Sequence, residues 1–189
     1  MTESAEELYA RASNALRVPD FTTWGTFPFE GDIQVRALKP PADETPRRGA
    51  GGVDCWSCDA ADDAFLWTDA DWRISAPREP SGFPVVIFLH PRAHYADPGD
   101  LPDDLAASFG IILARVERAV RSVGEIGRVH ISRWGDGGEH LHWWIYGRPA
   151  RMLQFQGTFA ALWDDLLPQY PEDLWKANLA RIASALSSP

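Results

Sequence analysis

Two histidines separated by a single residue are the first feature of this chain that could do chemistry. His140 and His142 lie in a short apolar and aromatic stretch, residues 139–146, with turn residues on both sides. This composition predicts a β-strand, and strand side chains alternate between the two faces of a sheet. Trp144 and Tyr146 would share a face with both histidines. Neighbouring same-face positions are about 6–7 Å apart, so one imidazole could bind a metal while the other acts as a base or nucleophile. Both could equally be structural histidines at a sheet edge.

The two cysteines of the chain, Cys55 and Cys58, have the C-x-x-C spacing of a metal site. A zinc ion would need two further ligands, and histidines must supply them because the chain has no other cysteine. The candidates are His90, His94, His130, His140 and His142, of which His90 and His130 are expected to be structural. A set of Cys55, Cys58, His94 and His140 would give closed tetrahedral S₂N₂ coordination, hence a structural site, and would leave His142 free.

Two other interpretations of the C-x-x-C pair remain open. A redox pair normally opens a helix after a strand, whereas Cys55 follows a glycine-rich linker and precedes a predicted hairpin. The remaining alternative is that the two cysteines are unrelated loop residues.

The overall composition limits the classes of function. The chain has 189 residues, a formal net charge of −9 and a pI near 4.9. This balance argues against binding to nucleic acids or anionic membranes, although a small anion could still bind in a local pocket. No apolar run approaches the roughly 20 residues that span a bilayer, and the acidic N-terminus lacks the features of a signal peptide. We therefore expect a cytoplasmic protein without nucleic-acid or membrane partners.

The elements that must position these side chains indicate an α+β fold with an antiparallel sheet. The expected strands are residues 32–38, 64–68, 71–76, 84–89, 129–133 and 139–146. The expected helices are residues 4–16, 102–123, 158–167 and 171–186, and the second has the strongest apolar stripe. A Pro/Gly-rich linker ends near residue 50. The predicted parts are an N-terminal extension and linker (1–50), a core domain (51–150) and a C-terminal helical extension (151–189).

From Cys55 to Arg148 the chain resembles the histidine triad (HIT) superfamily. The likeness is to its zinc-containing members, including the galactose-1-phosphate uridylyltransferase branch. The matching features, in chain order, are the C-x-x-C pair, the strand that leads to Pro91-x-x-His94, the long helix, the glycine-rich loop 135–138, the H-x-H pair and Arg148. The flanking segments look like those of uncharacterised HIT-like proteins from actinobacteria.

The resemblance implies both a metal site and a reaction. It implies structural zinc held by Cys55, Cys58, His94 and His140. It also implies that His142 attacks the α-phosphorus of a nucleotide, and that the nucleotidyl-histidine then passes its nucleotidyl group to water or to another phosphate. The expected contacts to this phosphate-containing ligand are Arg133, Trp134, Gly137, Gly138, Trp144 and Arg148. Family analogy further implies a homodimer formed through the long helix and the adjoining strands.

The chain departs from the HIT pattern at two positions. Trp144 stands where the hydrolases have a third histidine and the uridylyltransferases a glutamine, and an indole has one N–H donor and accepts no proton. Arg133 stands where relatives carry an asparagine; it could bind phosphate bidentately or pair with Asp136. Two principal functions therefore remain: a nucleotidyl hydrolase or transferase, and a catalytically silent binding module with structural zinc and an aromatic pocket. A C-x-x-C redox protein is a third, more distant alternative.

Overall fold

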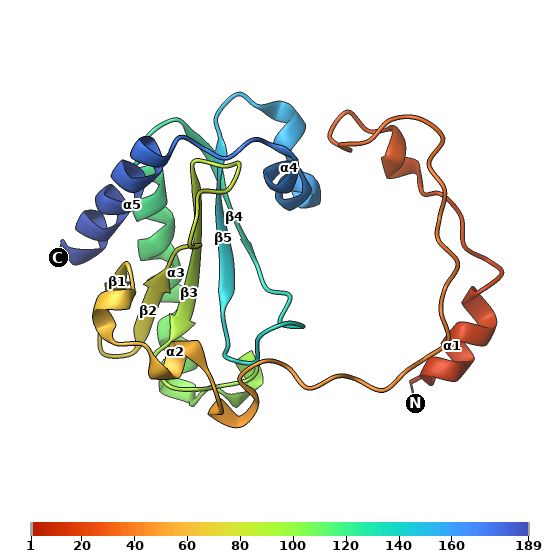
Figure 1. Ribbon diagram of the computed structural model, residues 1–189, viewed down its shortest axis with the longest axis horizontal. Helices are drawn as coiled ribbons and strands as arrows, with labels where there is room; N and C mark the ends of the chain where they lie inside the picture. The colour runs from red at the N-terminus through yellow and green to blue at the C-terminus, as the bar shows by residue number, and fades with distance from the viewer. Residues whose placement is uncertain (1, 189) are drawn as a thin grey trace.

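An antiparallel sheet forms the centre of the molecule, with its strands in the order β1-β2-β3-β5-β4 (Figure 1). The computed structural model describes residues 2–188. The strands are β1 (Trp67–Thr68), β2 (Trp72–Ser75), β3 (Val85–Pro91), β4 (Ile126–Ser132) and β5 (Trp143–Pro149). Every neighbouring pair is antiparallel. The predicted α+β class with an antiparallel sheet is confirmed.

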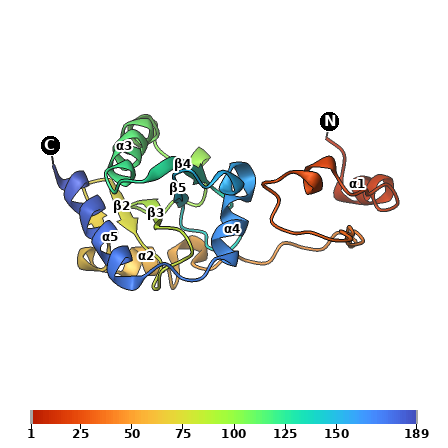
Figure 2. The same cartoon turned by 90° about the horizontal axis from the view of Figure 1, so that it is seen from above.

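Helices pack on both sides of this sheet (Figures 1 and 2). The α-helices are α1 (Ala5–Ala12), α2 (Trp56–Asp59), α3 (Asp103–Arg121), α4 (Ala160–Leu166) and α5 (Glu172–Ser187). Short 3₁₀ turns lie at Asp20–Thr23, Ala50–Gly52, Asp62–Ala64, Pro98–Asp100, Leu153–Phe155 and Gly157–Phe159. Among the helices of residues 2–188, none combines the length and the apolar character that crossing a bilayer requires.

The two-residue repeat of the strands divides the core into two layers. Ile87 and Ile145 are fully buried on the face that α3 and α5 cover. Val86 and Tyr146 point to the opposite face, where they join a smaller cluster with Ala160 of α4. One end of that opposite face carries the polar and aromatic side chains of the candidate site.

The N-terminal residues 2–46 form an arm that extends away from the sheet and returns to it near Arg48 (Figures 1 and 2). Helix α1 is shorter than the predicted 4–16; Ser4 caps its start in a capping box with Glu7. The predicted strand over 32–38 is wrong. These residues form no strand and most are exposed, so their alternating pattern has no neighbouring strand to pair with.

The expected strand over 139–146 begins later than predicted, because β5 starts at Trp143. The last β3 residue paired with β5 is Leu89, opposite Trp143. The preceding residues find other partners: the Leu141 N–H donates to the Tyr95 carbonyl at 2.7 Å. His140 and His142 therefore lie in the extended segment that leads into β5, where no ladder hydrogen bonds compete with side-chain contacts.

Helix α5 contributes to the same core as α3, and this can be tested by truncating a buried side chain. Ile182 is completely buried and belongs to the main cluster. We expect Ile182→Ala to lower the free energy of unfolding by about 2–5 kcal/mol, as cavity-forming substitutions do. Leu174→Ala on the same helix is the control, because Leu174 is 49% exposed. Equal urea midpoints for the two variants would show that α5 is not part of the core.

Candidate metal centre and active site

Four predicted metal ligands come together at one end of the sheet. Cys55 directly precedes α2 and Cys58 lies within it, so one helical turn places both thiols on the same side. His94 follows the end of β3 and His140 precedes the start of β5. The four ligand atoms of these residues all lie within 4.8 Å of one another.

The distances between these atoms fit a tetrahedral zinc site. The Cys55 Sγ lies 3.4 Å from the His140 Nδ1, and the Cys58 Sγ lies 3.5 Å from the Nδ1 of both His94 and His140. Zinc–sulfur and zinc–nitrogen bonds of about 2.3 and 2.0–2.1 Å give a sulfur–nitrogen edge of about 3.6 Å in a tetrahedron. The donor set and its spacing therefore fit this ion.

In both His94 and His140 the Nε2 atom has a polar partner, which leaves the Nδ1 atom free to bind a metal ion. The His140 Nε2–H donates to the Pro91 carbonyl at 2.9 Å, and burial lowers the pKa of His140, which favours the neutral ligand. The His94 Nε2 lies 3.4 Å from a Glu139 carboxylate oxygen. The Gly51 N–H donates to the same oxygen at 2.7 Å and lowers the pKa of Glu139. Such outer partners orient histidine ligands at metal sites.

The Cys58 thiol lacks the acidity that a redox pair needs. Burial, and then the neighbouring Cys55, raise the pKa of Cys58 to about 11. Reactive cysteines have lowered pKa values because the thiolate is the nucleophile. The Cys55 side chain is buried, and Cys58 is exposed at the surface. The pair is therefore suited to a bound cation, which stabilises thiolates, rather than to thiol–disulfide exchange.

A buried arginine links the C-x-x-C turn to the sheet through a hydrogen bond and an ion pair. Arg73 of β2 donates to the Ser57 carbonyl at 2.6 Å and pairs with Asp62 at 2.9 Å. Arg92 also pairs with Asp62, at 2.7 Å. These contacts fix the position of α2, and with it both cysteines, relative to β2 and β3.

The end of the N-terminal linker is bound to the glycine-rich loop. The Arg48 N–H donates to the Gly137 carbonyl at 3.0 Å, and the Glu139 N–H donates to the Arg48 carbonyl at 2.9 Å. This short parallel bridge brings residues 48 and 49 to the pocket beside His142. The linker is therefore part of the site.

His142 faces this pocket with a defined tautomer. Its Nδ1–H donates to the carbonyl oxygen of His140 at 2.8 Å, because a carbonyl oxygen can only accept. The other ring nitrogen, Nε2, then carries a bare lone pair. The side chain is half-buried, which leaves part of the ring accessible.

Two adjoining cavities meet at His142. The first, of about 270 Å³, is lined by residues of the C-x-x-C turn, the linker and Gly138, together with His90, His140 and His142. The second, of about 420 Å³, extends along the sheet past Ser75, Phe88 and Trp144. Both include Arg48 and Trp56 in their walls. Together they offer cationic, imidazole and aromatic surfaces to one ligand.

Some of the predicted ligand contacts lie at these cavities. Gly138 approaches the His142 ring closely, since a Cβ added to Gly138 would lie 3.9 Å from the His142 Cε1. Trp144 lines the second cavity, and exposed Trp134 packs against it edge-to-face with ring centroids 5.7 Å apart. The carbonyl of Gly137 is bonded to Arg48, and Gly137 is not among the residues that line either cavity.

The two predicted arginine contacts lie elsewhere. Arg133 donates to the Ala96 carbonyl at 3.1 Å and pairs with the Asp97 carboxylate. Its ion-pair partner is therefore Asp97 and not Asp136. Arg148 donates to the Met152 carbonyl at 2.9 Å. It lies near the far end of β5, roughly 20 Å from His142 by strand rise. The structure brings neither guanidinium to the pocket.

The sequence reasoning missed several residues of the pocket. Arg48, Trp56, Ser75 and Arg78 were not expected there, and His90 was expected to be structural. The alternation of β3 could have indicated the position of His90. Leu89 pairs with Trp143. His90 is the next residue after Leu89 and His142 is the residue just before Trp143, so the two histidines point to the same face. No local pattern marks Arg48, whose place depends on the return of the linker.

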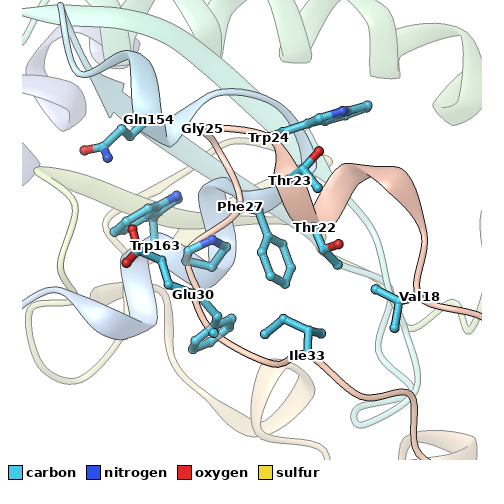
Figure 3. A pocket seen from close by; sticks show the side chains of 13 residues that line it. Val18, Thr22, Thr23, Trp24, Gly25, Phe27, Glu30, Ile33, Gln154 and Trp163 are labelled. Atoms are coloured by element: carbon cyan, nitrogen blue, oxygen red, sulfur yellow. The ribbon is translucent and has the colours of Figure 1, made fainter.

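A separate cavity of about 600 Å³ lies between the N-terminal arm and the body (Figure 3). Its walls include Phe27 and Ile33 of the arm and Trp163 of α4. The Trp163 Nε1–H donates to the Thr26 carbonyl at 2.8 Å. Among the described residues that line this cavity there is no histidine, cysteine or basic side chain. It therefore lacks the chemistry found beside His142.

The arrangement of strands and helices matches solved structures of histidine triad proteins. One from Bradyrhizobium japonicum superposes with a TM-score of 0.52 at 14% identity, over 65% of this chain and 89% of that one. The chain has the histidine triad fold. A histidine triad protein from Sinorhizobium meliloti gives a TM-score of 0.51 at 15% identity, over 64% and 87% of the two chains. A zinc-bound histidine triad family protein from Mycobacterium smegmatis gives 0.48 at 18% identity, over 70% and 95%.

The likeness to histidine triad proteins is one of fold. No family model matches the sequence, and no curated protein matches it either. The resemblance inferred from the motifs is confirmed at the level of the fold.

Proposed function

We propose that this protein binds a nucleotide or a related phosphoester and acts as a nucleotidyl hydrolase or transferase through His142. The observation that carries the proposal is the 2.8 Å contact between the His142 Nδ1 and the His140 carbonyl. A nucleophilic imidazole needs one bare nitrogen and a partner that fixes the other. The bare Nε2 belongs to a ring that lines both cavities.

The reaction would proceed in two displacements. The Nε2 lone pair of His142 attacks the α-phosphorus, the bond from phosphorus to the leaving oxygen breaks, and that oxygen keeps the electron pair. The product is a nucleotidyl-histidine whose Nδ1–H stays bonded to the His140 carbonyl. Water, or the oxygen of a second phosphate, then attacks phosphorus, and the histidine nitrogen recovers its lone pair. A proton from attacking water passes to solvent.

Trp144 restricts the leaving group in this scheme. It occupies the position of the third triad histidine and lines the cavity next to His142, but an indole N–H does not act as a general acid. A leaving oxygen would therefore have to depart as a stable anion. Phosphate and diphosphate do so near neutral pH, whereas an alkoxide or an amine needs a proton. We infer that a phosphoanhydride is the better substrate.

Arginines in the cavity walls supply positive charge in a protein of net charge −9. Arg48 lines both cavities and Arg78 lines the second. Guanidinium groups bind phosphate oxygens with paired N–H donors. These two residues take the place that the sequence had suggested for Arg133 and Arg148.

We further propose that the cluster of Cys55, Cys58, His94 and His140 binds structural zinc. Four protein ligands close a tetrahedral site and leave no position for substrate. Zinc bound there would link α2, the segment after β3 and the segment before β5. Because His140 also supplies the carbonyl that holds His142, the ordered metal site would maintain the tautomer of the nucleophile.

A labelling experiment tests the reaction. The protein is mixed with nucleoside diphosphates and triphosphates that carry ³²P at the α-phosphate, quenched in base and separated on a denaturing gel. A phosphoramidate is acid-labile and stable in base, so label that survives base and is lost in acid would identify the nucleotidyl-histidine. Absence of such label with every nucleotide, under single-turnover conditions, would overturn the proposal.

A catalytically silent binding module is the second candidate function. The observation that favours it is the aromatic wall formed by Trp56, Phe88 and Trp144, which could stack on a base. This candidate predicts that nucleotides raise the melting temperature without label or product. The labelling experiment and a thermal shift measured side by side distinguish the two functions.

We also propose a homodimer, by analogy with the proteins that share this fold. Strand β4 is an edge of the sheet, and Ile131 on it and Ile111 on α3 are 36% and 68% exposed. These apolar side chains belong to the elements expected at the interface. Sedimentation equilibrium should give twice the monomer mass of 21.0 kDa. Ile111→Glu should shift the protein toward monomer, and a monomeric wild type would contradict the analogy.

A further inference from the structure

A second imidazole lies beside His142 on the neighbouring strand. His90 of β3 is only 7% exposed, and its ring centroid lies 6.1 Å from that of His142. Both rings line the two cavities. His90 therefore faces the same ligand space as the proposed nucleophile, on the side of His142 opposite to β4.

The two nitrogens of His90 differ in their surroundings. Its Nε2 lies 2.7 Å from the Ser75 hydroxyl oxygen of β2. Its Nδ1 is buried and has no hydrogen-bond partner among the described residues. A buried polar atom without a partner costs about 1–3 kcal/mol, and such atoms in native structures call for an explanation. Here the atom belongs to a residue that lines the ligand cavities.

The environment of His90 keeps the ring neutral. His90 lies almost entirely out of solvent, and burial penalises the charged form of an imidazole. A neutral imidazole carries one proton, and the Ser75 hydroxyl can either donate to Nε2 or accept from it. When the Ser75 O–H donates to Nε2, the proton lies on Nδ1, and this N–H is the group without a partner.

We propose that His90 is a second functional histidine of this site, whose Nδ1–H donates a hydrogen bond to a phosphoryl oxygen of the bound ligand while Ser75 holds the opposite nitrogen. The inference rests on the proposed function, since it names a further contact within the same pocket. A donor fixed at this position stabilises the charge that builds up on phosphoryl oxygens during the displacement. It comes from β3, the strand paired with β5, which carries Trp144.

Nitrogen NMR of the free protein tests the tautomer. Long-range ¹H–¹⁵N spectra distinguish protonated from bare imidazole nitrogens, and His90→Gln identifies the signals of this ring. We expect the proton of His90 on Nδ1, and we expect that N–H signal to move when inorganic phosphate or AMP is added. A proton on Nε2 that persists after the addition of either ligand would overturn the proposal.

Three variants test the contribution to rate and binding. His90→Leu removes the donor and should slow single-turnover labelling by about 10²-fold, the size typical of one lost transition-state donor. His90→Gln keeps an N–H and should retain a rate within about tenfold of wild type, since a neutral hydrogen bond contributes about 1 kcal/mol. Ser75→Ala removes the hydroxyl that holds the Nε2 of His90, and its labelling rate should fall between those of the two His90 variants. Zinc content and melting temperature are measured alongside.

The outcomes separate this inference from the proposed function. If wild type is labelled and His90→Leu labels equally fast, His90 has only a structural role and the inference fails. If wild type is never labelled, the covalent mechanism fails, and the affinity for AMP decides the role of His90. A dissociation constant that rises at least tenfold in His90→Leu but not in His90→Gln would then support the contact. Equal constants would refute it.

Discussion

Replacing His142 by alanine is expected to reduce covalent labelling by at least about 10³-fold, because the other two histidines of the pocket have their ring nitrogens engaged elsewhere or protonated. His140 directs its Nδ1 toward the cysteines and its Nε2 to Pro91. His90 has its Nε2 bonded to Ser75, and its Nδ1 carries the proton in the tautomer proposed above, so neither nitrogen offers a bare lone pair. The loss should appear in the rate of label incorporation under single-turnover conditions, with nucleotide in excess of its dissociation constant.

The matched control for this experiment is His130→Ala. His130 is a half-buried histidine of β4 that lines neither cavity beside His142. Its substitution should leave labelling unchanged within a factor of about two or three. Both variants should retain zinc and show similar melting temperatures, because neither residue belongs to the metal cluster. Undiminished turnover in His142→Ala would refute the covalent mechanism, whatever product is formed.

Removal of the metal is expected to have the largest effect on stability. The protein as purified should contain one zinc per chain by elemental analysis. We expect a strong chelator, or the substitution Cys55→Ser, to lower the free energy of unfolding by about 4 kcal/mol or more, since zinc binding to the folded state contributes directly to folding. For a chain of this length, the melting temperature should fall by about 10 °C.

The size of this effect follows from what the metal would hold together. Cys55 and His140 are buried, so loss of the ion would leave two thiols and two imidazole nitrogens facing one another with only weak sulfur–nitrogen contacts. The Cys58 thiol, with its pKa raised by burial, would be protonated. The segments that carry the four ligands would then be joined by weaker contacts, chiefly Arg73 to Ser57 and His140 to Pro91.

Comparing variants with and without zinc distinguishes loss of the metal from a loss of stability that does not depend on zinc. His94→Ala removes one ligand and should destabilise mainly in the presence of zinc, whereas His130→Ala should cost little in either condition. Glu139→Gln weakens the hydrogen bond between residue 139 and the His94 Nε2, and it should lower zinc affinity by about 10–100-fold. A zinc-free preparation with the same unfolding curve as the zinc-loaded protein would show that the cluster does not stabilise the fold through a metal.

The sequence by itself determined much of the fold and the metal cluster. The apolar stripe of residues 102–123 is α3 with small changes at each end, because helix periodicity is a local property. The α+β class followed from the order of such elements. Short spacing also carried much of the chemistry: one helical turn places both cysteines of C-x-x-C together, and the H-x-H spacing puts His140 and His142 on the same side of an extended segment.

The tertiary structure alone decided the walls of the pocket. His90 comes next to His142 because β3 and β5 are paired in one register, and a one-residue shift would have turned it to the other face. Arg48 reaches the site through two backbone hydrogen bonds, one to Gly137 of the glycine-rich loop and one from Glu139 just after it, about ninety residues away in sequence. Arg133 and Arg148 are bound to Asp97 and Met152 instead. Side-chain partners of this kind depend on contacts between distant segments, and no local pattern encodes them.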